Sequence, residues 1–358
     1  MAPLQVGVAF AVVAALSFGV TTPIIEAMGR DVGPLMTAAL LYAGACLAAV
    51  LLRFRARARA GEGLVRANVP RLVLIALLGA ALAPALLAWG LQRAGATTGS
   101  LLLNFEAAFT VLLARAIYRE TLGRRVVLAV ALMVLAGALL AVDGVRGALG
   151  ALGGTGARAS AGAGALAVVG ATLAWALDNT LTRPLSDRDP VSVVGAKAAL
   201  GATLTATLAL VRHEPAPPAG GALALLACGA TGYGLSLFFY LMAQHRIGAA
   251  RTGSVFALAP FVGAAIAWLV GNRSAGWPTA VAAGLFGLGV FLHLTERHRH
   301  RHLHPATEHD HLHRHDDGHH DHVHVPPVVG EHAHPHRHEA LEHEHEHAPD
   351  LHHRHDHG

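Results

Sequence analysis

The chain has 358 residues, of which 53% are hydrophobic and only 14% are charged. Soluble globular proteins carry about 25% charged residues, so this composition excludes a soluble enzyme. The formal net charge is only +4 and the arginines are dispersed over short loops, which excludes a groove for nucleic acid. The two cysteines, Cys46 and Cys228, both lie in apolar runs, which excludes a disulfide scaffold.

Ten apolar runs are long enough to cross a membrane, which takes about 20 mostly apolar residues. The first run is too long for a signal peptide and has no basic residue before Arg30, so we expect it to be retained. The chain is therefore predicted to be an all-α polytopic membrane protein in the lipid bilayer. Its transmembrane helices are predicted near residues 4–27, 33–52, 71–91, 97–117, 125–143, 163–182, 190–211, 219–242, 248–271 and 276–295.

The loop arginines predict the orientation of these helices. With the N-terminus in the cytoplasm, the inside loops contain 13 arginines and the outside loops contain 6. The positive-inside rule favours this orientation. Ten crossings return the chain to the side on which it began, so both termini are predicted to be cytoplasmic, in the cytoplasmic (inner) membrane.

The apolar region also repeats itself. The segment GATTGSLLLNFEAAFTVLLARAIYRE, from Gly95, is similar to GAARTGSVFALAPFVGAAIAWLVGNR, from Gly248. A unit of five helices crosses the membrane an odd number of times, so its copy must enter inverted. Inverted repeats are typical of secondary transporters, whose substrate site lies near the membrane midplane. The predicted organisation is a first repeat, a Gly/Ala-rich linker, a second repeat and a tail, over residues 1–145, 146–162, 163–295 and 296–358.

Several of these segments resemble the EamA family of the drug/metabolite transporter superfamily. The resemblance rests on SFGVTTPIIEAM in the first helix, NFEAAFTVLLARAIYRETLGRRVVLAVALMVLAGALLAV in the first half, and WALDNTLTRPLS and FALAPFVGAAIAWLVGNRSAGWPTAVAAGLFGLGVFL in the second. It covers about residues 5–295 and implies ten helices in two inverted five-helix repeats, and transport or export of small solutes. Where the family often has Glu-Pro, this chain keeps only Glu106 in one half and only Pro260 in the other, so its halves are not equivalent.

Polar residues inside the predicted helices are candidates for a transport path. A charge at the centre of a bilayer costs about 2.5–3.5 kcal/mol on insertion scales, so such residues usually face a cavity or a partner. Glu106 is predicted to carry a proton or bind a cation, and its alternative is a structural carboxyl. Lys197, the only lysine, is either a counter-ion for Asp178 or Glu106, or a side chain that snorkels to the interface. The candidates for the path are Glu106, Asp178, Asn179, Asn104 and Lys197.

Histidine is concentrated in the tail, where 23 of the 26 lie between positions 298 and 357. The tail has almost no apolar periodicity, which predicts disorder. Its His-X-His repeats, interleaved with Asp and Glu, predict binding of divalent transition metals such as Ni, Co or Zn, and no other cofactor is expected. The predicted metal ligands are His309, His311, His313, His315, His319, His320, His322, His324, His332, His334, His336, His338, His343, His345, His347, His352, His353, His355 and His357.

Three functions are compatible with this sequence. One is a secondary transporter in which the metal on the tail is cargo or regulator. A second is an exporter of an organic metabolite or amino acid, with the tail as an accessory, and a third is a membrane-anchored metal sensor or chaperone. An enzyme is not expected, because no Ser-His-Asp set, P-loop or dinucleotide fingerprint is present. An alternative to metal binding is that the same histidines sense pH. A homodimer is also compatible with the sequence.

Overall fold

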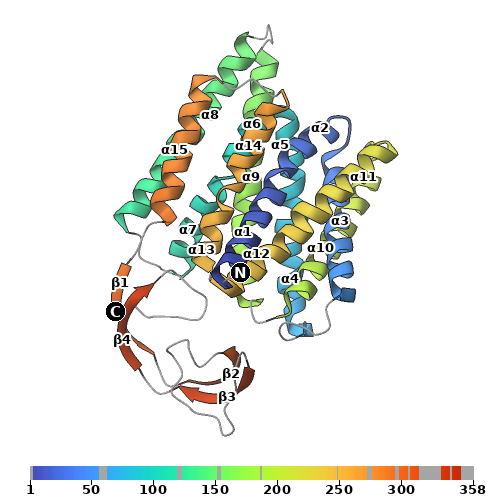
Figure 1. Cartoon of the computed structure of the whole chain (residues 1–358). Coiled ribbons are helices and arrows are strands. Elements are labelled where there is room, and N and C mark those ends of the chain that lie inside the picture. The colour runs from blue at the N-terminus through green and yellow to red at the C-terminus, as the bar shows by residue number, and fades with distance from the viewer. Residues whose placement is uncertain are drawn as a thin grey trace. The chain divides into compact units, whose positions relative to one another are not determined.

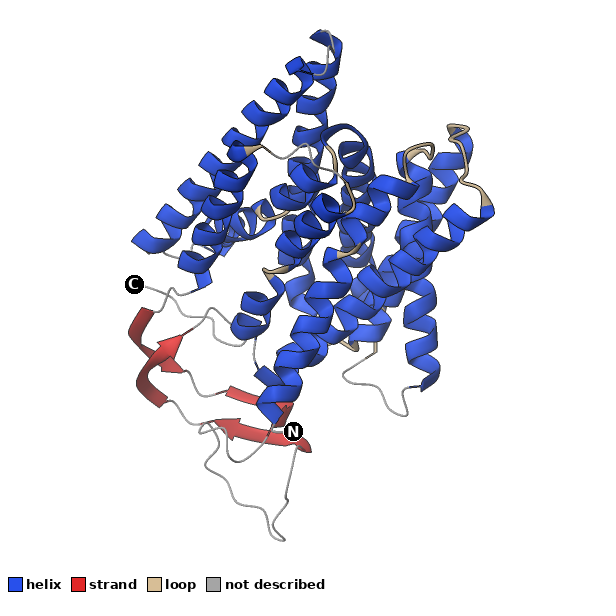
Figure 2. Ribbon diagram, turned by 45° about the horizontal axis from the view of Figure 1, so that its top comes forward, coloured by secondary structure: helices blue, strands red, loops and turns tan. Residues whose placement is uncertain are grey.

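Apolar helices form most of the chain up to residue 294. The computed structural model describes residues 3–55, 63–118, 123–150, 155–185, 188–247, 249–271, 276–294, 298–304, 307–313, 332–338 and 341–347. Its helices occupy only the first of two compact units, Met1–Glu296 and Arg297–Gly358, and its strands only the second (Figure 2).

The first half of the helical unit contains five successive crossings (Figure 1). Three of them are built from more than one helical segment, because the chain bends or changes its helical pitch within the crossing. Its elements are α1 (Pro3–Gly19), α2 (Thr21–Met28), α3 (Pro34–Arg55), η1 (Arg66–Asn68), α4 (Val69–Ile75), η2 (Ala76–Leu82), α5 (Ala83–Ala94), α6 (Ala96–Leu102), α7 (Phe105–Tyr118) and α8 (Arg124–Gly150).

The second half repeats this order. Its elements are α9 (Thr155–Thr182), η3 (Arg183–Leu185), α10 (Pro190–Val211), α11 (Ala219–Cys228), η4 (Gly229–Leu235), α12 (Ser236–Ile247), α13 (Ala249–Phe256), α14 (Ala259–Leu269) and α15 (Trp277–Leu294). Because α8 continues to Gly150 and α9 begins at Thr155, the segment expected to be a Gly/Ala-rich linker is helical wherever it is described.

Seven of the described helical segments are both long enough and apolar enough to span a bilayer. They are Gln5–Met28, Pro34–Phe54, Arg66–Ala94, Ala96–Ile117, Ala159–Thr182, Pro190–Val211 and Ala219–Ala243. The later segments Ala259–Leu269 and Trp277–Leu292 are apolar but shorter. The prediction of an all-α polytopic membrane protein is confirmed.

Helices of the first half pack against helices of the second half in a symmetric pattern. The second helices of the two halves, α3 and α10, pack on each other, and so do the fifth helices, α8 and α15 (Figure 1). The third helix of each half packs on the first helix of the other half, as α5 does on α9 and α12 on α1. Such reciprocal contacts are what a pseudo-twofold axis between two five-helix repeats produces.

The irregular points of the helices also repeat. The third helix of each half contains a seven-residue π-helical segment, η2 in the first half and η4 in the second. The fourth helix of each half breaks after about two turns, at Leu103–Asn104 and again at Ala257–Leu258. Wide π turns are rare and occur frequently at functional sites, so these matched irregularities indicate where the two repeats build their site.

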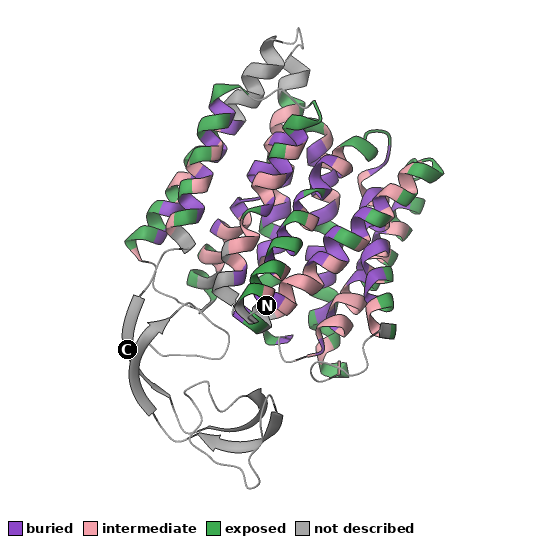
Figure 3. Cartoon of the chain, in the orientation of Figure 1, coloured by how far each residue is buried: buried purple, intermediate pink, exposed green. Residues whose placement is uncertain are grey.

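Small side chains dominate the interfaces between these helices. Alanine accounts for many of the fully buried residues, and larger ones such as Leu41, Leu87 and Phe286 fill the spaces between them. Buried residues lie where helices face one another, and exposed ones lie on the outer faces (Figure 3). Because lipid is as apolar as these side chains, helix association in a membrane depends on such close packing rather than on removal from water.

In the tail, for which the sequence predicts disorder when free, the structure describes four strands. They are β1 (His298–His304), β2 (Thr307–His313), β3 (His332–His338) and β4 (Leu341–His347). β1 pairs with β4 and β2 pairs with β3, both antiparallel. Alternation of histidine with another residue has the period of two that a strand requires, and this explains the difference from an expectation based on hydropathy alone.

Candidate functional site

The only lysine of the chain forms a buried ion pair. Lys197 Nζ, on α10, donates a hydrogen bond to Asp178 Oδ2, near the end of α9. The Asp178 side chain is 2% exposed and that of Lys197 is 15% exposed. Thr182 Oγ1, one turn further along α9, donates to the other Asp178 oxygen at 3.3 Å. Of the roles foreseen for Lys197, the structure therefore shows the counter-ion of Asp178.

The next residue of α9 contacts a different helix. Asn179 Nδ2 donates a hydrogen bond of 2.8 Å to Glu106 Oε1, in the first turn of α7. Consecutive residues of a helix are rotated by about 100°, so Asp178 faces α10 while Asn179 faces α7. Asn179 is exposed and Glu106 is half-buried. One turn of α9 thus joins both acidic candidates, a connection that the sequence did not predict.

The π-helical segment η2 lies beside this turn. The backbone carbonyl of Gly79 accepts two side-chain hydrogen bonds, from Tyr42 Oη at 2.5 Å and from Trp175 Nε1 at 3.0 Å. A wide turn releases a carbonyl from the regular helical ladder, and a buried carbonyl needs a donor. A side chain at Gly79 would overlap the Asp178 carboxylate, so glycine is required by the close approach of α9.

The second repeat builds the same arrangement without the charge. A side chain at Gly232 of η4 would overlap Thr21, which occupies in α2 the position that Asp178 has in α9. Thr21 Oγ1 donates to Phe18 O at 2.6 Å, across the junction of α1 and α2. The two halves therefore share a backbone design and differ in chemistry, because only one has an acidic residue against the π-helical glycine.

Four aromatic rings gather where the halves meet. Tyr233 lies 5.5 Å from Tyr42, 5.7 Å from Phe18 and 6.3 Å from Trp175, measured between ring centroids. Phe18 and Trp175 are 6.3 Å apart in an edge-on arrangement. None of these four residues was among the candidates predicted from the sequence. Two of them had a signal in the sequence, because Trp175 lies one turn before Asp178 and Tyr233 follows Gly232 directly.

Asn104 does not join this cluster. Its amide donates to Leu101 O at 2.8 Å and so satisfies a carbonyl at the break between α6 and α7. It is 4% exposed, and its contact indicates a structural role at the bend. Among the described residues with described side chains, no three His, Cys, Asp or Glu side chains gather as a metal site requires.

The histidines of the tail divide into two groups. Strands β2, β3 and β4 contain His309, His311, His313, His332, His334, His336, His338, His343, His345 and His347. The remaining predicted ligands lie outside the described residues; they are His315, His319, His320, His322, His324, His352, His353, His355 and His357.

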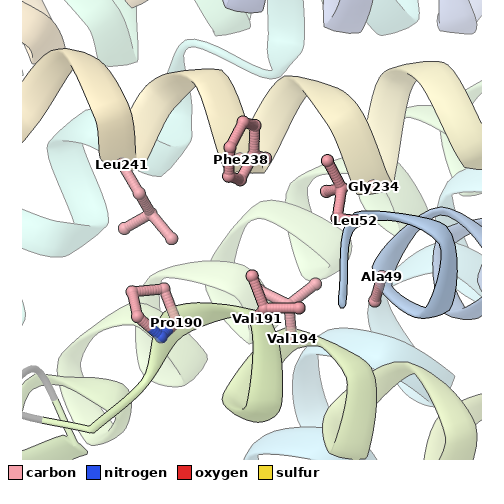
Figure 4. A pocket seen from close by; sticks show the side chains of 8 residues that line it. All are labelled: Ala49, Leu52, Pro190, Val191, Val194, Gly234, Phe238 and Leu241. Atoms are coloured by element: carbon pink, nitrogen blue, oxygen red, sulfur yellow. The ribbon is translucent and has the colours of Figure 1, made fainter. Parts of the chain in front are cut away.

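A separate apolar groove lies between α3, α10 and the third helix of the second half (Figure 4). All of its lining side chains are apolar, so it offers no group for proton or ion chemistry. It is lined by Ala49, Leu52, Pro190, Val191, Val194, Gly234, Phe238 and Leu241.

Comparison with known proteins explains the duplicated architecture. The model of the EamA-like transporter family matches twice, over residues 5–142 and 162–295. The chain belongs to the EamA-like transporter family. Each match covers one five-helix repeat, so the family unit is present in two copies. The protein is thus a multi-pass membrane protein of a transporter family.

The chain is also similar to a curated protein and to a solved structure. An uncharacterized transporter of Methanothermobacter thermautotrophicus is 29% identical over 233 residues, which are 62% of this chain and 63% of the relative. A solved crystal structure matches with a TM-score of 0.56 and 19% identity, covering 82% of this chain and 98% of that one. At this identity the second likeness concerns the fold alone.

Proposed function

We propose that this EamA protein is a secondary transporter that moves a small solute past Glu106 and the Asp178–Lys197 pair. The observation that carries this proposal is the turn of α9 on which Asp178 and Asn179 bring both acidic groups together. Ionisable groups inside membrane helices are costly, and they usually belong to a substrate or ion path. This turn also lies at the interface of the repeats, where transporters of inverted design bind their substrates.

The charges of the cluster favour a proton or a cationic group as the species bound at Glu106. Asp178 is already paired with the ammonium of Lys197, whereas Glu106 is hydrogen-bonded to the neutral amide of Asn179. A carboxylate whose hydrogen bond comes from a neutral amide can exchange a proton for the positive group of a solute. We propose that this exchange couples transport to a proton gradient.

The aromatic cluster favours an organic solute over a metal ion as cargo. Two rings of the aromatic cluster, Tyr42 and Trp175, donate to Gly79 O, the glycine that Asp178 approaches. Aromatic faces attract organic cations. Imidazole and thiolate, which transition metals prefer, do not accompany Glu106 among the described contacts. We propose that the tail binds divalent transition metals and regulates transport, while transport of the metal itself is the second candidate.

The proposed location is the cytoplasmic membrane, with both termini in the cytoplasm. The excess of arginine in alternate loops, 13 against 6, supports this orientation. The tail would then be in contact with the cytosolic metal pool. No catalytic step is part of this proposal.

The experiment is a transport assay with purified protein in liposomes under an imposed proton gradient. Uptake of amino acids, organic amines, Ni²⁺, Co²⁺ and Zn²⁺ is compared for the native chain, Glu106→Gln and Glu26→Gln. Glu26 is a control carboxylate near the end of its helix, where it is paired with Arg30, whose side chain is 66% exposed. We expect Glu106→Gln to lose gradient-driven uptake at least tenfold and Glu26→Gln to retain it.

Two results would contradict the proposal. Gradient-driven uptake that survives in Glu106→Gln removes the coupling role of this residue. Uptake of metal ions but of no organic solute makes the second candidate, metal transport, the correct one. Removal of residues 297–358 in the same assay separates the path from the tail, because only regulation by added metal should be lost.

A further inference from the structure

The register of the tail strands places histidine opposite histidine. Antiparallel pairing aligns three such pairs in the β1–β4 ladder and three in the β2–β3 ladder. Alternate positions of a strand share one face, so the three pairs of each ladder form a row on one face. The pairs are His298–His347, His300–His345, His302–His343, His309–His336, His311–His334 and His313–His332.

The positions between the histidines favour this register. In β1 they include Arg299 and Arg301, and the register sets them opposite Glu346 and Glu344 of β4. Oppositely charged residues at directly opposed positions stabilise an antiparallel pair. A slip by one residue would set histidine opposite Glu or Arg at every one of these places. The strand with the arginines and the strand with the glutamates are therefore complementary only when the histidines are paired.

The second ladder follows the same rule with fewer charges. Glu308 of β2 stands opposite Arg337 of β3, and Leu312 stands opposite Ala333. Pro335 stands opposite Asp310, and proline is tolerated because each strand of a two-stranded ladder is an edge strand. Here too the interleaved residues occupy the face that the histidines do not.

We propose that each cross-strand histidine pair is a two-nitrogen site for a divalent transition metal, with up to six ions in two rows. Directly opposed residues have Cβ atoms about 4.5–5.5 Å apart, and zinc binds imidazole nitrogen at about 2.0–2.1 Å, so one ion can bridge two rings. Successive pairs are two residues apart, which is about 6.8 Å along the strand and leaves room for separate ions. Water completes each coordination shell, so the ions exchange.

This inference rests on the proposal that the tail binds metal, and it adds which histidines act together. It includes His298, His300 and His302, which the ligand set predicted from the sequence left out. It also couples metal to folding, because an ion that bridges two strands stabilises their pairing over the unpaired chain. The tail would therefore gain strand structure as metal is added.

The test counts metal ions on the full chain in detergent, by equilibrium dialysis against Zn²⁺. One variant exchanges neighbours in each ladder, His300→Arg with Arg301→His and Asp310→His with His311→Asp. The number of histidines is unchanged, but two cross-strand pairs are broken. The control variant, Arg299→Glu with Glu346→Arg, reverses one charge pair and keeps every histidine in register.

We expect the exchanged variant to bind about two ions fewer than the native chain, one for each broken pair, and the control to match the native chain. Electron paramagnetic resonance of bound Cu²⁺ should show two nitrogen ligands per ion. Equal metal counts for the exchanged and native chains would overturn the pairing and leave metal binding by the tail intact. If removal of residues 297–358 does not lower the count, both the pairing and the metal-binding role of the tail are wrong.

Discussion

Replacement of Lys197 by Met should strongly destabilise the helical unit, because it leaves Asp178 buried without its counter-ion. The two side chains are 2% and 15% exposed, so solvent screens the pair little. Breaking a buried ion pair costs about 3–5 kcal/mol, whereas replacing both partners by neutral groups is often nearly neutral. At about 2–4 °C per kcal/mol, the single variant should unfold roughly 6–20 °C lower.

The double variant Asp178→Asn with Lys197→Met provides the decisive comparison. It removes both charges, so it should recover most of the lost stability. The assay is the unfolding temperature of the detergent-purified chain, followed by fluorescence-detected size-exclusion chromatography after heating. The control is Arg30→Met, which removes an ion pair whose arginine side chain is 66% exposed and should cost less than about 1 kcal/mol. If Lys197→Met and Arg30→Met shift the temperature equally, or if the double variant is no better than Lys197→Met, the ion pair does not stabilise the fold as argued.

Three further predictions concern the same helices and use the same thermal assay. Gly79→Ala and Gly232→Ala should each lower the free energy of unfolding by about 1–3 kcal/mol, because the added methyl overpacks the interface. Gly284→Ala is the control, since its added methyl would meet nothing within 4 Å and should not destabilise. Equal effects at all three positions would contradict the close approach at the π-helical turns. Tyr42→Phe and Trp175→Phe should each lower the free energy of unfolding by about 0.5–1.5 kcal/mol, because one donor to Gly79 O remains in each. The double variant removes both donors and should cost more than the sum of the two single changes. Strict additivity would show that the two side chains do not share this carbonyl. Asp189→Ala should lower the free energy of unfolding by about 0.5–2 kcal/mol, because Asp189 caps α10 by accepting from Ser192 N at 3.0 Å. Asp189→Asn should retain most of that stability, since asparagine also caps helices. If asparagine is as harmful as alanine, the ion pair with Arg53 matters more than the cap.

The sequence predicted the helical framework well because membrane helices depend on a strong and local signal. Twenty apolar residues in a row leave few alternatives to a helix, and the repeat of Gly95–Ser100 in Gly248–Ser254 indicated the duplication. The interruptions could not be predicted in the same way. The turns around Gly79 and Gly232 follow from the approach of α9 and of Thr21, which are contacts between distant parts of the chain.

The candidate site was predicted residue by residue but not as an arrangement. The pairing of Asp178 with Lys197 was one of several options, since spacing along the chain does not determine which helices are neighbours. The contact of Asn179 with Glu106 joins residues 73 positions apart, and the Asn104 amide donates to the backbone carbonyl of Leu101. In the tail, hydropathy predicted disorder, while the alternation of residues contained the strand period that the structure shows.

The unequal chemistry at Gly79 and Gly232 has a consequence for the energetics of alternating access. In a chain made of two identical repeats, exchanging the conformations of the halves converts the inward-open state into the outward-open state, and the two states have equal free energy. Here one half sets Asp178 against its π-helical glycine and the other sets Thr21 there. The Asp178–Lys197 pair therefore has different surroundings in the inward-open and outward-open states, so the two states differ in free energy. In the proposed transport cycle the empty protein would therefore favour one of the two states, and the free energy spent in leaving that state is returned when the protein resets.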